Sequence, residues 1–547
     1  MEYFTPLQQL QKNVIRHPNK VFLHQPVNRQ WQEYSWADVE YQARCIANGL
    51  KSQGFDTGAR IGILSKNCAH WIIADLAIMM AGMISVPIYP TADHDNIGYI
   101  IDHTDLKAIF IGKLDATDEV EIALGNELLT IAFPYPTVPT RVQFIDWLTE
   151  YAPLKNIYPS TLDDIATIVY TSGSTGRPKG VVLSAKNMVS VIQSLVELFN
   201  VPNTFRAISY LPLAHIVERS NEYVALYTGC EVFFVESLDT FIDDLQYARP
   251  TGFISVPRLW TIFQSNVLKN ISQKKLSLLL AIPLVGHWVA KKIRKKLGLH
   301  HSQWFVSGTA PIAIPLLHWY KKLNIPISEG WGMTETSGAS CINYPWSELS
   351  LGTIGTPLSC IEMKLSTDSE ILIRGDAVFK EYYLDAQATK ASFDNGWFHT
   401  GDCAEVNEQG EYTIIGRIKD KFKTSKGKYV TPVPIESLLC TNLDIEQVCV
   451  MGSGMKQPVA LIVLTALVNK RDNEVINRLK NTLAMVNSGL ESHQKLDCLL
   501  ICKEAWSVEN NLLTPTMKIK RHIIEQKYNE ITTKQMSSPV IYEEDLL

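Results

Sequence analysis

Short apolar runs alternate with helical patterns from about residue 60 to about residue 375. Between the runs, apolar residues recur at the three- and four-residue spacing of amphipathic helices. This alternation predicts an α/β fold with mainly parallel sheets. The candidate strands are residues 61–64, 84–89, 108–111, 165–170, 205–210, 231–235, 252–256, 304–306 and 326–328.

The pattern changes after residue 415. A lysine-rich turn at 419–429 precedes two apolar strands near 447–451 and 459–464, and a helix follows around 474–486. These elements predict a small α+β domain. A chain of 547 residues is also too long for a single hydrophobic core, so we expect several folding units. The sequence has no 20- to 50-residue repeat of the kind that predicts a solenoid.

One uncharged segment, residues 276–290, is followed by five cations within residues 291–296. Fifteen residues interrupted by Pro283 and Gly286 are too few for the roughly 20 that span a bilayer. Two interpretations stay open. The favoured one is a helix packed on the body of the protein with the basic run in solvent, and the other is a peripheral contact with anionic lipid.

Composition and charge narrow the class of protein. The chain is 46% hydrophobic and 20% charged, with a formal net charge of -5, which is typical of a globular protein and unlike a nucleic-acid-binding one. Its ten cysteines show neither Cys-x-x-Cys pairs nor zinc-ligand spacing, which favours reduced core cysteines. The first residues lack the apolar stretch of a secretory signal. We therefore expect a cytoplasmic protein, with membrane association left open.

The loop at 170–180, YTSGSTGRPKG, combines glycines, hydroxyls and a lysine after a predicted strand. Glycines let the backbone approach an anion, hydroxyls donate hydrogen bonds, and the lysine adds positive charge. The loop lacks the Gly-Lys-Ser/Thr ending of the common nucleoside-triphosphatase loop. Because helical spacing begins at Met188, we expect it to join a strand to a helix. Its candidate polyphosphate ligands are Thr171, Ser172, Gly173, Ser174, Thr175, Gly176 and Lys179.

Further polar motifs follow predicted strands, at the sheet edge where α/β proteins bind ligands. His215 lies in LPLAHIVER, Gly308 and Thr309 lie in SGTAP, and EGWGMTET occupies residues 329–336. In the last motif glycines flank Trp331, which suits stacking on a flat base, Thr334 suits a phosphate, and the carboxylate of Glu335 suits Mg²⁺. The candidate residues here are Glu329, Gly330, Trp331, Gly332, Thr334 and Glu335.

Asp402 and Arg417 carry the next pair of candidate functional groups. The carboxylate of Asp402, at the end of GWFHTGD, accepts hydrogen bonds, and the guanidinium of Arg417 donates them. Either residue alone is more often part of a structural salt bridge. Their order behind the other motifs favours a nucleotide site.

Together these motifs resemble the acyl-adenylate-forming (AMP-binding) superfamily, and in particular the bacterial long-chain fatty-acid acyl-CoA synthetases. The resemblance implies an N-terminal AMP-binding and acyl-substrate domain at 1–416 and a mobile C-terminal catalytic domain at 417–547, with the hinge near Lys419. It implies that Asp402 and Arg417 clamp the ribose, that Gly427 lines the CoA channel, and that His215 positions the substrate carboxylate. Lys518, in LTPTMKIKR, is the implied catalytic lysine. Trp331 replaces the usual tyrosine and Met517 a frequent glycine.

The implied reaction is ATP-dependent activation of a carboxylic acid through an acyl-AMP, followed by transfer to CoA. The implied partners are a fatty acid, ATP, CoA and Mg²⁺, without nucleic acid. Alternatives stay open: a fatty-acyl-AMP ligase that loads a carrier protein, a medium-chain or aryl-acid CoA ligase, a catalytically silent acyl-nucleotide sensor, and a fatty-acid uptake partner.

Overall fold

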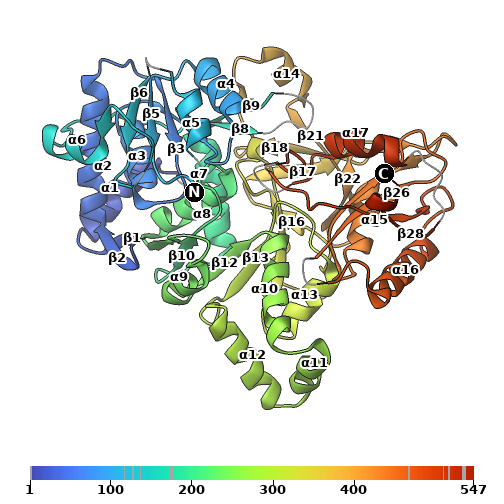
Figure 1. The fold of residues 1–547 in the computed structure, drawn as a ribbon. Coiled ribbons are helices and arrows are strands. Elements are labelled where there is room, and N and C mark those ends of the chain that lie inside the picture. The colour runs from blue at the N-terminus through green and yellow to red at the C-terminus, as the bar shows by residue number, and fades with distance from the viewer. Residues whose placement is uncertain are drawn as a thin grey trace.

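A computed structural model describes residues 3–115, 117–125, 128–135, 137–171, 177–465, 468–508, 510–514, 518–532 and 538–546. The N-terminal half forms α/β layers, and the chain after residue 420 forms a separate lobe beside them (Figure 1). The prediction of an α/β fold with mainly parallel sheets in the large part and a smaller α+β part is confirmed. In the described chain, no helix has both the length and the apolar character needed to cross a bilayer.

The largest sheet in the described residues has eight strands in the order β19-β9-β8-β4-β3-β5-β6-β7. It is parallel from β8 to β7, and its near-continuous apolar strands are buried by helices on both faces. The strands are β3 (Arg60–Leu64), β4 (Ile84–Ile88), β5 (Ala108–Ile111), β6 (Leu129–Ala132), β7 (Val142–Gln143), β8 (Ile165–Thr171), β9 (Lys179–Ser184) and β19 (Glu381–Tyr382). The helices in its sequence range are α2 (Trp36–Ser52), α3 (Ala69–Met80), α4 (His94–Thr104), α5 (Asp118–Ala123), α6 (Phe144–Glu150) and α7 (Ala185–Phe199).

The chain around the glycine-rich loop differs from the prediction. The loop joins β8 to β9, which pair antiparallel, rather than joining a strand to a helix. Residues 180–184 are buried and continue the sheet, so the helix α7 begins only at Ala185, where Ser184 caps it. The helical spacing read from Met188 onward was correct, but the short apolar run before it is a strand.

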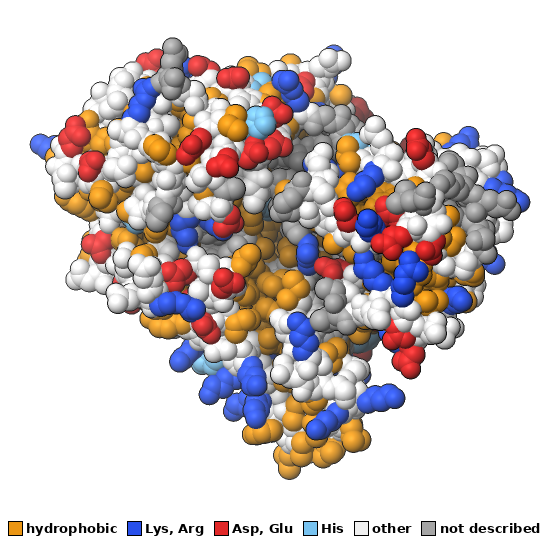
Figure 2. Space-filling model, in the orientation of Figure 1, with side chains coloured by type: hydrophobic (Ala, Val, Ile, Leu, Met, Phe, Trp, Pro, Cys, Tyr) orange, Lys and Arg blue, Asp and Glu red, His pale blue; other side chains and the backbone are white. Residues whose placement is uncertain are grey.

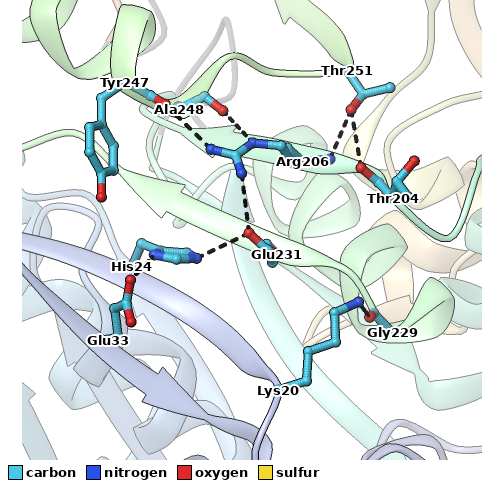
Figure 3. A network of polar contacts seen from close by, with 10 residues as sticks. All are labelled: Lys20, His24, Glu33, Thr204, Arg206, Gly229, Glu231, Tyr247, Ala248 and Thr251. Carbon is cyan, nitrogen blue, oxygen red and sulfur yellow. Dashed lines mark hydrogen bonds and ion pairs between the residues drawn. The ribbon is translucent and has the colours of Figure 1, made fainter. Parts of the chain in front are cut away.

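A second sheet has the order β10-β11-β1-β2. A polar network ties its strands together (Figure 3): Glu231 accepts from Arg206 and contacts His24, at 3.4 and 3.2 Å, and Arg206 Nε also donates to the carbonyl of Ala248. This network fixes the strand that leads to the His215 motif. The elements are α1 (Pro6–Arg16), β1 (Val21–Val27), β2 (Gln30–Ser35), β10 (Arg206–Ser209), α8 (Ile216–Thr228), β11 (Glu231–Phe234) and α9 (Phe241–Ala248).

A third sheet, ordered β12-β13-β14-β15-β16, carries the SGTAP and EGWGMTET motifs at its strand ends. Its elements are β12 (Gly252–Ser255), α10 (Pro257–Asn270), α11 (Gln273–Ala281), α12 (Val285–Lys296), β13 (Trp304–Ser307), α13 (Ile314–Lys321), β14 (Ile327–Trp331), the 3-10 turn η1 (Thr334–Thr336), β15 (Cys341–Ile342) and β16 (Thr356–Pro357).

An antiparallel sheet follows, which the sequence pattern did not separate from the parallel ones. It brings Asp402 opposite Arg417. Its elements are β17 (Ile361–Leu365), β18 (Glu370–Gly375), α14 (Ala386–Ala391), β20 (Phe393–Asp394), β21 (Trp397–Val406) and β22 (Tyr412–Arg417).

The C-terminal lobe has two apolar clusters built only from residues after 421. A four-stranded sheet, β25-β26-β27-β28, lies between them. Its elements are η2 (Ile418–Asp420), β23 (Phe422–Lys423), β24 (Tyr429–Val430), α15 (Pro432–Leu439), β25 (Ile445–Met451), β26 (Val459–Leu464), α16 (Asn473–Ser488), β27 (Leu499–Ile501), α17 (Arg521–Thr532), β28 (Val540–Tyr542) and η3 (Glu543–Asp545).

Candidate active site

The glycine-rich loop is anchored by the two strands that flank it. Thr171 ends β8, Lys179 begins β9, and the Thr171 hydroxyl donates to the Lys179 carbonyl at 3.5 Å. The Lys179 ammonium lies 4.8 Å from the ring centre of Tyr382, a favourable cation–π contact. The loop residues between them, Ser172, Gly173, Ser174, Thr175 and Gly176, lie outside the described residues.

Tyr382 connects this lysine to the predicted metal ligand. Its hydroxyl donates to Glu335 Oε1 at 2.9 Å, and Glu335 is buried on the turn η1 beside Thr334. Burial raises the pKa of Glu335, although the Tyr382 hydrogen bond and the Arg417 charge oppose the rise. A buried carboxylate that has lost hydration gains from a cation placed against it.

Trp331, Asp402 and Arg417 form one hydrogen-bonded unit. The Trp331 indole N–H donates to Asp402 Oδ2 at 3.0 Å, and Arg417 Nε donates to Asp402 Oδ1 at 2.7 Å. Asp402 is buried, and its charge raises the pKa of Arg417. Sequence reasoning gave Trp331 only a stacking role and missed its bond to Asp402. The signal available was the tryptophan itself, since only an indole brings this N–H.

The Trp331 bond gives a first prediction. Trp331→Phe keeps a flat ring but removes the N–H that orients Asp402. We expect the KM for ATP to rise by up to about tenfold, since a hydrogen bond to a charged group is worth about 1.5–3 kcal/mol and only part of it bears on ATP binding. Steady-state kinetics at saturating acid measures this. Trp288→Phe, at a remote exposed tryptophan, is the matched control and should change nothing. An unchanged KM in Trp331→Phe would show that the indole N–H does not contribute.

The backbone around Trp331 requires its glycines. A Cβ on Gly332 would lie 2.2 Å from the Gly338 carbonyl oxygen, and one on Gly308 would lie 3.3 Å from the Gly330 carbonyl oxygen. Thr309 adopts φ +70°, a strained conformation for a β-branched residue. The loop after β13 and the end of β14 are therefore held in close contact.

Glu329 is directed to a different partner. Its Oε1 accepts from the Gly352 N–H at 3.0 Å, and burial raises its pKa to about 8. No described contact joins its carboxyl group to Asp402, Glu335 or Arg417. Its placement supports the loop at residues 350–353.

His215 caps the N-terminus of α8. Its Nδ1 accepts from the Val217 N–H at 3.2 Å, which leaves the proton of the neutral ring on Nε2. Burial, and next the charge of Lys518, lower the pKa of His215 to about 3. The ring is therefore a neutral hydrogen-bond donor through Nε2 at physiological pH.

Lys518 reaches the site from the C-terminal lobe. A small antiparallel bridge between Leu513 and Ile519 holds its backbone, and the Lys518 N–H donates to Thr514 Oγ1 at 3.1 Å. Although the residue keeps exposed surface, desolvation of its ammonium and the nearby Arg417 charge lower the pKa of Lys518, while Asp402 and Glu335 oppose this. Lys518 is thus the group whose charge interacts both with His215 and with the Asp402, Arg417 and Glu335 side chains.

The remaining predicted residues are Lys419, just before the C-terminal lobe, and Gly427, inside it. Lys419 is exposed on η2, directly after β22. Gly427 adopts φ +78° in the turn between β23 and β24, where its N–H donates to the Thr424 carbonyl at 2.9 Å. No described contact joins either residue to the Asp402 cluster.

A buried ion pair holds α8, the helix that His215 caps, and it was not predicted from the sequence. Arg219 on α8 pairs with Asp75 on α3 at 2.5 Å, and both side chains are almost fully buried. Arg219 also donates to Thr167 and Ser85, and the Tyr223 hydroxyl donates to Asp75. The signal in the sequence was Asp75, the one charged residue in the apolar helix α3.

Comparisons with known proteins identify the family of the chain. The model of the AMP-binding enzyme family matches residues 10–383, and that of the AMP-binding enzyme C-terminal domain matches residues 419–535. Fatty acyl-CoA synthetase A of Dictyostelium discoideum is 30% identical over 91% of this chain and 85% of that protein. A long-chain-fatty-acid–CoA ligase of Mycobacterium bovis is 28% identical over 93% of each chain.

Solved structures agree on the fold. The anthranilate CoA ligase AuaEII, in complex with anthranoyl-AMP, matches with a TM-score of 0.81 at 20% identity, over 97% of this chain and 98% of that one. Since a family model matches well over half of the sequence and its C-terminal counterpart matches most of the rest, the chain belongs to the AMP-binding enzyme family.

Proposed function

We propose that this protein activates a long-chain fatty acid with ATP, through an acyl-AMP, and transfers the acyl group to CoA with release of AMP and pyrophosphate. The carrying observation is the hydrogen-bonded unit of Trp331, Asp402 and Arg417, together with Lys518 from the C-terminal lobe, whose pKa is shifted by the charges of Arg417 and Asp402. A silent binder of nucleotide has no need of that lysine. The relatives named as long-chain acyl-CoA ligases support the substrate class and the acceptor.

In the first half-reaction a carboxylate oxygen of the acid attacks the α-phosphorus of ATP and forms the acyl-AMP. The bond between the α-phosphorus and the oxygen that bridges it to the β-phosphate breaks, and pyrophosphate leaves. Two anions must approach, so the protein acts by positioning and charge stabilisation. Lys518 bridges the carboxylate and the α-phosphate, the 171–179 loop holds the β- and γ-phosphates, and Asp402 and Arg417 hold the ribose. Neutral His215 donates from Nε2 to the carboxylate.

The carboxylate of Glu335 is a suitable ligand for Mg²⁺ at this site. The described residues hold no cluster of three or more His, Cys, Asp or Glu that would form an all-protein cage. Mg²⁺ in nucleotide sites is instead held by one or two carboxylates together with substrate phosphates. Glu335 is such a carboxylate. Its pKa is raised because burial disfavours the negative charge, and a bound cation would offset that cost. When bound, the ion would offset the negative charge of the phosphates.

In the second half-reaction the CoA thiol sulfur attacks the acyl carbon, a C–S bond forms, and the bond to the AMP oxygen breaks. We propose that the 417–547 domain rotates about Lys419 before this step, which withdraws Lys518 and presents the Gly427 turn. Lys419→Pro restricts that backbone. We expect it to slow thiolation of supplied acyl-AMP more than formation of acyl-AMP, as single-turnover assays of each half-reaction would measure. Equal effects on both would argue against a hinge at Lys419.

The pKa shifts predict the pH profile of acyl-AMP formation. Lys518 must carry its proton and its pKa is lowered, so the alkaline decline should begin below the ordinary pKa of lysine. Glu335 must be ionised and its pKa is raised, so the acid limb should lie above the ordinary value of glutamate. The residual activity of Lys518→Arg, whose guanidinium stays charged, should lack the alkaline decline. The same decline in this variant would assign it to another group.

The cavity beside α8 is too small to hold the acyl chain. It is lined by Leu76, Tyr223 and Leu226 among others and has a volume of about 10 Å³, which is enough for one water molecule.

The acyl length that the protein accepts and the acceptor that it uses distinguish the proposal from its rivals. Pyrophosphate release should be measured with acids from acetate to oleate, with CoA, with a carrier protein, and with neither. Release with long acids and acyl-CoA formation supports the proposal. CoA-insensitive release with carrier loading supports a fatty-acyl-AMP ligase, preference for short or aryl acids supports the other ligases, and no release supports a sensor.

A further inference from the structure

The helices α11 and α12 form a hairpin that projects from the body of the protein, at the lower end of the view in Figure 1. Its inner side is attached to the core, because Leu276 and Ala290 are buried and Leu280 and Val289 pack against the same cluster. The Trp319 indole N–H also donates to Gln273 at 3.0 Å. The expectation that residues 276–290 pack on the body therefore holds for one side of the hairpin only.

The tip and outer side of the hairpin are apolar and exposed. Every residue from 281 to 285, the sequence AIPLV, is exposed. Leu284 is 87% exposed, Leu278 67% and Trp288 61%. Single exposed apolar residues are ordinary on a protein surface, but a contiguous apolar tip marks an interaction site.

The turn at the tip is strained in a way that displays Leu284. Leu284 adopts φ +65° and ψ −50°, and the Val285 N–H donates to the Pro283 carbonyl two residues back at 2.8 Å, which is a rare γ-turn. A Cβ on Gly286 would lie 2.5 Å from the Leu280 carbonyl oxygen, so the two helices approach closely just behind the turn. The hairpin is a compact support for an exposed leucine.

A basic collar flanks the apolar tip in the sequence, and the space-filling view shows basic and apolar side chains side by side at this end of the molecule (Figure 2). The sequence from 273 to 296 contains no Asp or Glu. The collar lysines are all exposed, and no ion pair is recorded for any of them within the described chain. They are Lys274, Lys275, Lys291, Lys292, Lys295 and Lys296.

We propose that this hairpin docks the protein on the surface of an anionic lipid bilayer. Helices that lie at such surfaces bury their apolar residues about 5–10 Å deep, and flanking lysines are attracted to the negative headgroups. Val285 and Lys291 are six residues apart on α12, so at about 1.5 Å per residue Lys291, the first lysine of the collar on this helix, lies roughly 9 Å behind the tip. When the tip enters the interface, the collar reaches the headgroups.

The charge pattern favours lipid over a second copy of this chain. Two copies that met tip to tip would bring two unpaired basic collars together, and like charges repel. An anionic membrane neutralises the collar and covers the apolar tip in a single contact. This inference concerns location and does not depend on the reaction that the protein catalyses.

Flotation of the full-length protein with vesicles tests the proposal. We expect binding to vesicles of phosphatidylcholine mixed with phosphatidylglycerol, weaker binding to phosphatidylcholine alone, and loss of the difference at high salt. Leu284→Ser with Trp288→Ser, and separately Lys291→Glu with Lys292→Glu, should each lower the vesicle-bound to free ratio by about tenfold or more. All four residues are exposed, so the variants should keep the circular dichroism and thermal unfolding of the wild type.

Matched controls lie elsewhere on the surface. Leu238→Ser with Leu349→Ser changes two leucines that are 88% and 92% exposed, and Lys480→Glu with Lys503→Glu makes the same change of net charge on the C-terminal lobe. Both controls should bind vesicles as the wild type does. Equal loss in variants and controls, or no vesicle binding by the wild type, would overturn the proposal. A dimer in sedimentation that only the tip variant abolishes would instead assign the tip to self-association.

Discussion

Lys518→Ala should slow acyl-AMP formation severely and leave thiolation of supplied acyl-AMP close to the wild-type rate. Its ammonium is the group that comes from the C-terminal lobe into the Asp402 cluster, and removing one preorganised donor of this kind costs about 2.7–4 kcal/mol, or roughly 10² to 10³ in rate. The proposed rotation turns the domain away before the second half-reaction, so the lysine would no longer touch the reacting atoms. Rapid-quench measurement of each half-reaction separates the two effects.

Lys520→Ala provides the matched control for that experiment. Lys520 lies two residues away on the same segment, but its ammonium donates to Asn511 instead of facing the cluster. We expect it to keep both half-reactions. If Lys518→Ala slowed both half-reactions equally, the proposed division between them would be wrong.

Asp75→Ala should lower the free energy of unfolding by about 3–5 kcal/mol, because it leaves the buried Arg219 guanidinium without its counter-charge. Arg219 lies on α8 one turn after His215, so the loss should also disturb the His215 end of the helix. Urea unfolding followed by tryptophan fluorescence measures the change. Asp75→Leu combined with Arg219→Met should recover part of it, since that pair leaves no buried charge.

An exposed ion pair supplies the comparison for Asp75. Asp243 pairs with Arg29 at 3.1 Å, with both side chains more than half exposed, and Asp243→Ala should cost no more than about 1 kcal/mol. A similarly small loss for Asp75→Ala would mean that Arg219 finds water or another partner, and the buried pair would not be what holds α8.

Much of the fold was predictable because parallel strands buried on both faces leave a strong apolar signal. The strands at 61–64, 108–111 and 252–256 correspond to β3, β5 and β12. The error at β9 arose because this short strand is followed directly by the helix α7. The apolar residues of the strand therefore run into the helical spacing of the apolar residues that follow. The antiparallel sheet of β17, β18, β20, β21 and β22 was missed because buried and exposed positions alternate along strands such as β17 and β21.

The site was predictable where one motif carries one function, and less so where residues act across elements. The motifs identified Asp402, Arg417, Glu335 and Lys518 separately, and the structure brings them together. Contacts such as Trp331 to Asp402 and Arg219 to Asp75 join residues 71 and 144 positions apart, and local spacing carries no signal for them. The sequence identified residues 276–296 as an uncharged segment with a basic run, but it did not show which of their side chains are exposed.

Oxygen-18 transfer tests the central claim most directly. A long-chain fatty acid labelled in its carboxylate should be incubated with the protein, ATP and CoA, and the products analysed by mass spectrometry. Attack of the carboxylate on the α-phosphorus, followed by cleavage at the acyl carbon, leaves one labelled oxygen in AMP and none in pyrophosphate. Label in inorganic phosphate with formation of ADP, or acyl-CoA formed without label in AMP, would contradict an acyl-AMP intermediate.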